Sequence, residues 1–547
     1  MLSRNRWTQA VLLSLVAVLF VVGCGGGDDD EGSGGGAGTA AAEQTLKWGL
    51  GAEYNLDPGL ATDTTSAKLV LNLFDPLVKL ADDLEAVPSM AESWDVTGAK
   101  VVYHLRSGAK WSNGDPVTAK DYEYGWKRAL SPELASDYSY QLYGIKGAVE
   151  YNECEKNCAA LRDAVAIKAT DDQTLEVTLT STQPWFIQQS AHSVFLPVHQ
   201  ATIEKFGDRW TRAENIVTNG PFKVEDAQPS ASITLIKNPD WRDAANVKLE
   251  RVEGKIIVDG TTAVQSFEAG EVDVLDEQLP AAETPRLKDT PEYELYPGLG
   301  TSYYGFNVKD NITDVNQRRA MSLAVDRQSI IDNITQANEK PANAFTPDGM
   351  PGEEEIVGEG SPFTPASGDL DMAKEYMAKA QNPKTKITIY SNEGAPNKEV
   401  AQALQSMWKQ IGIDSTIKIL EWQQFLEFLG PPAPKAVDIY RLGWVGDFVD
   451  DINFLELWTC DSGNNNTGFC DEEYDALVAK AKKTPDNTER YAIYKELEAK
   501  LTGPDGALPF IPLWYITYPN LERETVKETF KINLLDQVDL TQVEIKG

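Results

Sequence analysis

The chain has 547 residues, of which 42% are hydrophobic and 24% are charged. This composition is that of a globular protein, which excludes fibrous structure and disorder over the whole chain. The length corresponds to at most about three or four domains. Asp and Glu number 84 against 50 Lys and Arg, so the net charge is −34. A chain this acidic repels phosphate backbones, and we expect no nucleic-acid partner.

The first 24 residues have the pattern of an export signal. Arg4 and Arg6 form a short positive region, and residues 10–22 form a nearly unbroken apolar run that is too short for a membrane span. The run ends at Gly23-Cys24 and resembles the cleavage site of a bacterial lipoprotein. We therefore expect residues 1–23 to be removed as a signal peptide and the Cys24 thiol to carry a lipid. The alternatives are an uncleaved membrane anchor and a free thiol.

Residues 24–44 are rich in Gly and Ala and contain a run of four acidic residues. Such a segment cannot bury a core, and we expect it to be a flexible linker behind the lipid. The folded part would then lie outside the cytoplasm, anchored to the outer face of the cell membrane.

Four further cysteines occur as two local pairs, Cys154 with Cys158 and Cys460 with Cys470. In an oxidising compartment four cysteines form two disulfides, with three possible connectivities. We favour the two local pairs. The alternative is a zinc site made from all four cysteines, for which their spacing is poor.

Apolar alternation and turn residues predict strands at residues 101–105, 174–180, 233–237 and 386–390. Helical patterns cover residues 118–130, 315–334, 398–411, 471–483 and 488–501, and the first of these opens with Thr118 and Asp121 as a capping box. Strands mixed with helices of this length predict α/β packing.

Signatures of catalysis are missing from the sequence. It contains no GxSxG, HExxH, GxxxxGK[ST] or helix-opening GxGxxG string. The pairs Asp82-Asp83 and Asp450-Asp451 could suggest glycosidase carboxylates, but in so acidic a chain we expect them on solvated faces. With only three His residues, a His-rich metal site is also not expected. We expect a protein that is not an enzyme, without catalytic residues, cofactor or metal.

Aromatic residues are more informative, with 13 Trp, 20 Tyr and 17 Phe. Several lie beside Gly, Asn or Asp, as in residues 443–448, GWVGDF. Most aromatic side chains fill cores, but aromatic residues next to Gly, Asn or Asp favour a ligand cleft with aromatic walls and a few polar groups.

One long stretch, AESWDVTGAKVVYHLRSGAKWSNGDPVTAKDYEYGWKRAL at residues 91–130, resembles the solute-binding proteins of peptide ABC importers, family 5. Four further stretches match the same family in the same order, at residues 216–224, 302–331, 441–448 and 511–515. The resemblance covers essentially residues 45–547. It is strongest to the oligopeptide-binding type, followed by the dipeptide-binding type.

The resemblance implies an α/β fold, a two-lobed periplasmic-binding-protein-like clamshell of type II (cluster C). The first lobe would take residues 45–299, with an extra subdomain at about 76–200. The second lobe would take residues 300–514, and residues 515–547 would return to the first. Ligand would lie in the cleft and be buried by hinge closure.

The resemblance also implies the binding residues. Asp447, in GWVGD, matches the residue that pairs with the ammonium of a bound peptide, since an unpaired buried charge is costly. Trp444 and Trp422 match cleft-lining tryptophans, and Tyr138 matches a tyrosine that faces the ligand from the other lobe. Arg441 matches a basic residue that can bind a short peptide's carboxylate. Each residue could instead have a core, capping or surface role.

The sequence departs from some relatives, because Val445 and Asn397 stand where those proteins carry Cys and His. Peptide length therefore stays open. We expect a monomeric lipoprotein that captures oligopeptides and delivers them to ABC permease subunits. The alternatives are another solute in the same fold (a dipeptide, sugar or metal chelate), a secreted hydrolase, and a cell-surface interaction protein. We attribute the charge of −34 to solubility or habitat rather than to ligand preference.

Overall fold

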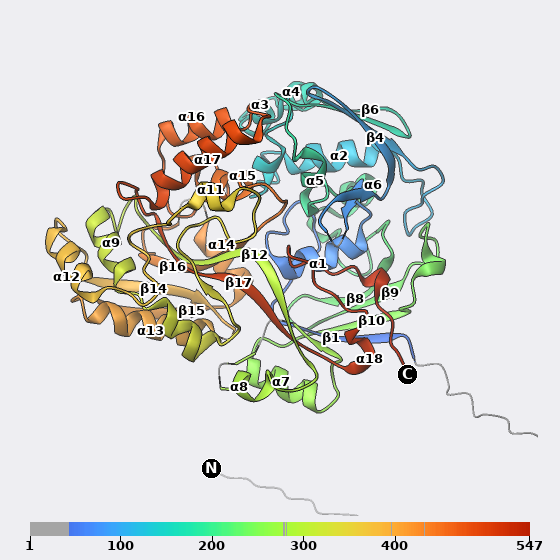
Figure 1. Cartoon of the computed structure of the whole chain (residues 1–547). Helices are drawn as coiled ribbons and strands as arrows, with labels where there is room; N and C mark the ends of the chain where they lie inside the picture. Colours follow the sequence, from blue (N-terminus) through green and yellow to red (C-terminus); the bar gives the residue numbers. More distant parts are fainter. Residues whose placement is uncertain (1–42, 82, 277–278, 281, 395, 431–432) are drawn as a thin grey trace, which may run out of the picture. The chain divides into compact units, whose positions relative to one another are not determined.

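The computed structural model describes residues 43–547 except residues 82, 277–278, 281, 395 and 431–432 (Figure 1). The predicted signal peptide, Cys24 and nearly all of the predicted linker lie outside the described residues. No helix in the described part is both long and apolar enough to cross a membrane.

One large mixed sheet organises this part of the chain. Its strands follow the order β15-β14-β16-β12-β17-β11-β1-β10-β9-β8, and β13 pairs with β17 outside that path. The strands are β1 (Thr45–Leu50), β8 (Phe222–Gln228), β9 (Ser232–Lys237), β10 (Arg251–Ile256), β11 (Val274–Leu275), β12 (Tyr293–Phe306), β13 (Lys340–Pro341), β14 (Lys386–Asn392), β15 (Asp414–Leu420), β16 (Ile439–Val445) and β17 (Phe510–Glu522).

Two long antiparallel strands, β12 and β17, connect the two ends of this sheet and run side by side (Figure 1). Residues 293–297 of β12 pair with residues 517–521 of β17, near β11. After a register shift, residues 301–305 pair with residues 510–515 on one side and with β16 on the other. The predicted lobe boundaries, 299/300 and 514/515, therefore fall inside these two strands. The boundaries themselves stay a prediction.

Residues 76–200, the predicted subdomain, contain sheets of their own. A two-stranded sheet joins β2 and β3, and a four-stranded antiparallel sheet has the order β4-β5-β7-β6. Helix α2 (Ala119–Ala129) buries Tyr122 and Trp126, and Trp126 meets Tyr103 of β5 edge to face. The strands are β2 (Val78–Leu80), β3 (Ala86–Pro88), β4 (Ala91–Thr97), β5 (Lys100–Leu105), β6 (Ile167–Asp171) and β7 (Thr174–Thr178).

All four predicted strands are confirmed, as β5, β7, β9 and β14. The capping box before α2 is confirmed as well, since the Thr118 backbone N–H donates to Asp121 Oδ2 at 2.7 Å. Three more predicted helices are confirmed with end shifts of one or two residues. They are α13 (Asn397–Lys409), α16 (Glu472–Ala481) and α17 (Asn487–Thr502).

The single helix predicted at residues 315–334 is wrong. The segment divides into α9 (Val315–Leu323), α10 (Arg327–Ile330) and a π-helical turn (Ile331–Thr335). Asp326 starts the second helix by accepting a hydrogen bond from the Ser329 backbone N–H at 2.9 Å. The buried Arg327 side chain donates to the Pro512 carbonyl of β17 at 2.7 Å, and this tertiary contact favours the break.

Three further helices contribute residues to the cavity or to the hydrogen bonds around it. They are α1 (Thr64–Leu73), α14 (Trp422–Leu429) and α15 (Ile452–Leu455). The C-terminal tail returns to α1, where the Asn72 side chain donates to the Val538 carbonyl and accepts from the Leu540 backbone N–H.

Candidate ligand-binding cleft

A cavity lies where the two parts of the large sheet meet. It offers about 340 Å³ to the centres of water-sized molecules, at the lower end of the range of roughly 300–1,000 Å³ for ligand pockets. All five predicted ligand residues line it: Tyr138, Trp422, Arg441, Trp444 and Asp447. The structure therefore brings together side chains that are more than 300 residues apart in sequence, while their contact with a ligand stays a prediction.

Strand direction explains why polar side chains collect here. Strands β15, β14 and β16 are parallel neighbours, and the cavity-lining residues Glu421, Glu393 and Asp447 follow their carboxyl ends. Strand β1 is likewise parallel to β11, and Glu53 and Asp276 follow the carboxyl ends of these two. In open α/β sheets, ligands bind outside the carboxyl ends of the strands.

Asp447 is 7% exposed and is surrounded by hydrogen-bond donors from both sides of the cavity. Its Oδ2 accepts from Gln141 Nε2 at 2.7 Å and from Asn453 Nδ2 at 2.8 Å. Its Oδ1 has longer contacts, with Tyr138 OH at 3.4 Å and His192 Nε2 at 3.2 Å. These groups replace the water that the carboxylate loses on burial. The long contacts leave Oδ1 as the oxygen more open to a stronger donor.

His192 is oriented by the backbone of its own turn. Its Nδ1 accepts a hydrogen bond from the Val194 N–H at 3.2 Å. A neutral imidazole has one donor and one acceptor nitrogen, so this contact places the proton on Nε2. The Nε2–H then points toward the Asp447 carboxylate.

Tyr138 and Trp444 form an aromatic wall beside Asp447. Their rings stack with centroids 6.1 Å apart and an interplanar angle of 26°. Asn453 Oδ1 fixes this arrangement, because it accepts from Trp444 Nε1 at 3.1 Å and from the Asp447 backbone N–H at 2.9 Å. Burial, with the nearby charge of Asp447, raises the pKa of Tyr138 well above its usual value, so the phenol keeps its proton.

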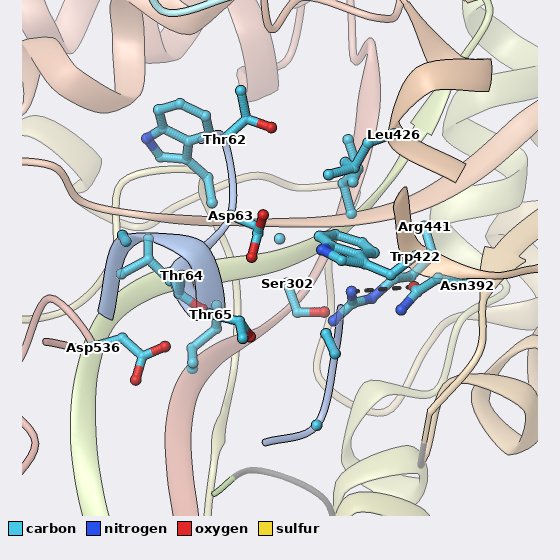
Figure 2. A pocket seen from close by; sticks show the side chains of 18 of the residues that line it. Thr62, Asp63, Thr64, Thr65, Ser302, Asn392, Trp422, Leu426, Arg441 and Asp536 are labelled. Carbon is cyan, nitrogen blue, oxygen red and sulfur yellow. Dashed lines mark hydrogen bonds between the residues drawn. The ribbon is translucent and has the colours of Figure 1, made fainter. Parts of the chain in front are cut away.

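Trp422 and Arg441 lie at another part of the cavity wall (Figure 2). Trp422 opens α14, and the next residue, Gln423, donates from Nε2 to Oδ2 of Asp63, the residue that caps α1, at 3.4 Å. Arg441 Nη1 donates to Asn392 Oδ1 at 3.4 Å, the dashed line in Figure 2. Its guanidinium therefore faces the cavity from β16.

Acidic side chains outnumber basic ones around the cavity. Among the described lining residues, the basic side chains are Lys68 and Arg441, and nine are acidic: Glu53, Asp63, Asp137, Asp276, Glu339, Glu393, Glu421, Asp447 and Asp536. Lys68 is 2% exposed, and its Nζ contacts Asp276 at 2.7 Å and Asp536 at 2.6 Å. One of the two cations is thus already held between two carboxylates.

The cysteines pair as favoured, Cys154 with Cys158 and Cys460 with Cys470. The second bond closes a loop that brings Gly463, Asn464 and Asn466 to the cavity. This pairing contradicts the four-cysteine zinc alternative. Within the described ranges, no group of three or more His, Cys, Asp or Glu residues is arranged to hold a metal ion.

The expectation of a solvated face for Asp450 and Asp451 is wrong. Both are buried, at 7% and 0% exposed. Asp450 accepts hydrogen bonds from Tyr494 at 2.5 Å and Arg490 at 3.0 Å in the packing of α17. Neither residue lines the cavity, so the pair does not form an open carboxylate site.

Sequence analysis missed three groups that surround Asp447: Gln141, His192 and Asn453. The resemblance pointed to the carboxylate but gave no reason to select these neighbours. His192 was set aside because His residues are few. A local signal existed only for Asn453, six residues after Asp447, where a short turn can bring a side chain back.

Residues 85–466 match the model of the bacterial extracellular solute-binding proteins, family 5. The chain belongs to this family. It is 34% identical over 545 residues to the oligopeptide-binding protein OppA of Bacillus subtilis, covering 96% of each chain. It is also 34% identical to a probable deoxycholate-binding periplasmic protein of Escherichia coli, covering 84% of this chain and 85% of that one.

Solved structures confirm the two-lobed clamshell. The complex of Haemophilus influenzae OppA with the peptide RPPGFSPFR has a TM-score of 0.85 at 26% identity, covering 92% of this chain and 99% of that one. The unliganded open form of Escherichia coli MppA, a murein tripeptide-binding protein, scores 0.62 at 28% identity, covering 93% and 99%. The present arrangement is therefore closer to the peptide complex than to the open form.

Proposed function

We propose that this chain captures oligopeptides outside the cytoplasm and delivers them to the permease of an ABC importer. The observation that carries the proposal is the buried Asp447 carboxylate in the wall of a cavity, beside the stacked rings of Tyr138 and Trp444, in a family 5 fold. A receptor of this kind performs no chemistry on its ligand.

In this proposal Asp447 binds the peptide's ammonium. Gln141 and Asn453 hold Oδ2 at short distances, whereas the contacts of Oδ1 are long. An ammonium beside Oδ1 makes a stronger, charge-assisted hydrogen bond than the neutral groups do. Tyr138 and Trp444 then border the first residue, and Arg441 is the proposed partner of a short peptide's carboxylate.

The lobes of the proposal are residues 45–299 and 300–514, with residues 515–547 returning to the first. A ligand can reach the buried Asp447 only if the lobes separate, and the continuous strands β12 and β17 are the proposed hinge. The anchor of the proposal is a lipid on Cys24, which would hold a monomer beside its permease at the outer face of the membrane.

Asp447→Asn tests the ammonium site. The substitution keeps the size of the side chain and removes its charge, so it leaves the ammonium of a bound peptide without a counter-charge. Loss of one partner of a buried pair costs about 3–5 kcal/mol, and we expect the Kd for a free-amine peptide to rise at least about a hundredfold in calorimetry.

The control ligand is the same peptide with an acetylated N-terminus. It should bind the wild-type protein weakly and lose little more in Asp447→Asn, which completes a double-mutant cycle. Equal affinity of wild type and variant for the free-amine peptide would remove Asp447 from the site. Scattering on the same samples should give a smaller radius with peptide than without, and an unchanged radius would contradict hinge closure.

A further inference from the structure

The charges that line the cleft are unbalanced. Nine acidic side chains face two basic ones among the described lining residues, and one of the two, Lys68, is enclosed by Asp276 and Asp536. Acidic residues outnumber basic ones nine to two in this lining, against 84 to 50 in the whole chain, so the cleft is more acidic than the chain as a whole. A neutral ligand would leave this excess of negative charge uncompensated.

Three of these carboxylates come from different strand ends. Glu53 follows β1, Glu393 follows β14 and Glu421 follows β15. The Glu393 backbone N–H donates to the Leu420 carbonyl at 2.9 Å, which places Glu393 beside Glu421. Glu53 reaches the same part of the cavity although it is more than 360 residues away from Glu421 in sequence. Gln423 Nε2, at the start of α14, donates to the Glu53 carbonyl at 3.4 Å and holds the two segments together.

This proximity costs free energy when the cleft is closed and empty. Burial, followed by the charges of Glu421 and Glu393, raises the pKa of Glu53. Glu421 also caps the N-terminus of α14, because its two carboxylate oxygens accept hydrogen bonds from the backbone N–H groups of Gln423 at 2.7 Å and Gln424 at 3.1 Å. Like charges this close repel each other unless a cation lies between them.

A buried hydroxyl group in the same cavity, that of Ser302, independently favours a polar ligand. Ser302 of β12 lines the cavity and is 2% exposed (Figure 2). Its Oγ has no hydrogen-bond partner among the residues that the structure describes. A buried hydroxyl of this kind costs free energy until a donor or acceptor reaches it.

We propose that the cleft selects peptides that carry a lysine or arginine side chain, which binds between the carboxylates of Glu53, Glu393 and Glu421. The inference rests on the proposed peptide function and names its substrate class. The cation also offsets the repulsion that opposes closure, so ligand charge and closure favour each other.

Matched tripeptides test the proposal on the purified protein. Lysine replaces one alanine of Ala-Ala-Ala at each position in turn, and norleucine, which has the same chain without the charge, replaces it in a parallel set. At the preferred position we expect the lysine peptide to bind about 10- to 100-fold more tightly in calorimetry. The preference should shrink as salt is added, because salt screens the partly exposed carboxylates.

The double substitution Glu53→Gln/Glu393→Gln removes two of the charges and leaves the Glu421 cap of α14 in place. It should lower the preference for lysine over norleucine by at least about threefold, with norleucine affinity unchanged or improved. Glu427→Gln is the matched control, since Glu427 is an exposed residue of α14 that does not line the cavity. It should leave the preference unchanged.

Each outcome separates the two proposals. Equal binding of lysine and norleucine peptides to wild type, at all three positions, overturns the cation preference and leaves peptide capture standing. A lysine preference that persists unchanged in the double variant overturns the assignment to these carboxylates. If neither these tripeptides nor longer peptides of the same two sets bind, whether neutral or charged, the proposed function itself fails.

Discussion

Asp447 and Asp451 are four residues apart and have opposite surroundings. Asp447 faces a cavity and contacts four side-chain groups. Asp451 is fully buried, and neither of its carboxyl oxygens has a hydrogen-bond partner within the described residues. Burial, followed by the charge of Asp450, raises the pKa of Asp451 well above its usual value. The carboxyl group of Asp447 is suited to a ligand cation, whereas that of Asp451 is buried in the core at a cost in free energy.

Asp451→Asn should therefore stabilise the protein at neutral pH. A raised pKa means that the folded state keeps a proton that the unfolded state releases, so stability falls as pH rises above the unfolded pKa of about 4. Asparagine has no proton to lose. We expect urea denaturation at pH 7 to show a free energy of unfolding higher by about 1 kcal/mol or more, with a smaller gain near pH 4.

The matched control is Asp450→Asn, because Asp450 binds Arg490 and Tyr494. Removing its charge leaves a buried guanidinium without its partner, and we expect a loss of stability. Equal destabilisation by Asp451→Asn at every pH between 4 and 8 would contradict a protonated Asp451.

At the scale of elements, α1, β11 and the C-terminal tail meet at Lys68. The ammonium of Lys68 lies between Asp276, which follows β11, and Asp536 of the tail. All three side chains are at most 5% exposed. The ion pairs therefore attach the tail to the floor of the cleft, next to the contacts of Asn72 with Val538 and Leu540.

Lys68→Met should destabilise the empty protein strongly. It leaves two neighbouring carboxylates buried without their cation, at a cost of about 3–5 kcal/mol in urea denaturation. Lys79→Met is the matched control, since Lys79 pairs with Asp539 of the same tail while both side chains are more than 40% exposed. We expect at most about 1 kcal/mol there. A similar small loss for both substitutions would show that the buried ion pairs do not hold the tail.

The elements that the sequence predicted correctly are those whose signals lie within a few neighbouring residues. Buried and more exposed residues alternate along β5, and the capping box needs only Thr118 and Asp121, so the positions of both could be predicted from short stretches of sequence. The break inside residues 315–334 has a local part, because Asp326 caps the second helix. It also has a distant part that no local pattern indicates, because Arg327 hydrogen-bonds to Pro512, 185 residues away.

At the scale of the whole molecule, the strands β12 and β17 belong to both parts of the large sheet. Two continuous strands can bend where their pairing is irregular, and the register shift between Pro297 and Thr301 is such a place. The proposed hinge thus lies in the long strands β12 and β17. The cleft is lined by residues that follow the carboxyl ends of the strands on either side.

The anchor also concerns the whole molecule. Cys24→Ala should move the protein from the membrane fraction to the soluble fraction of the cells, because a thiol is needed to carry the lipid. Fractionation followed by mass spectrometry of the N-terminus checks this expectation. A variant that remains with the membranes, without any lipid, would contradict the predicted anchor.

The sequence by itself determined the family, the α/β class and the candidate Asp447, because ordered motifs and apolar residues with a period of 2 or 3.6 can be identified within short stretches of sequence. It also supplied the net charge, which we assigned to solubility. Only the tertiary structure decided where those charges lie. It gathers Glu53, Glu393 and Glu421 from three strand ends, and it surrounds Asp447 with Gln141 and His192 from a distant segment. Such neighbours are set by strand order and direction, which bring together residues that no local pattern relates.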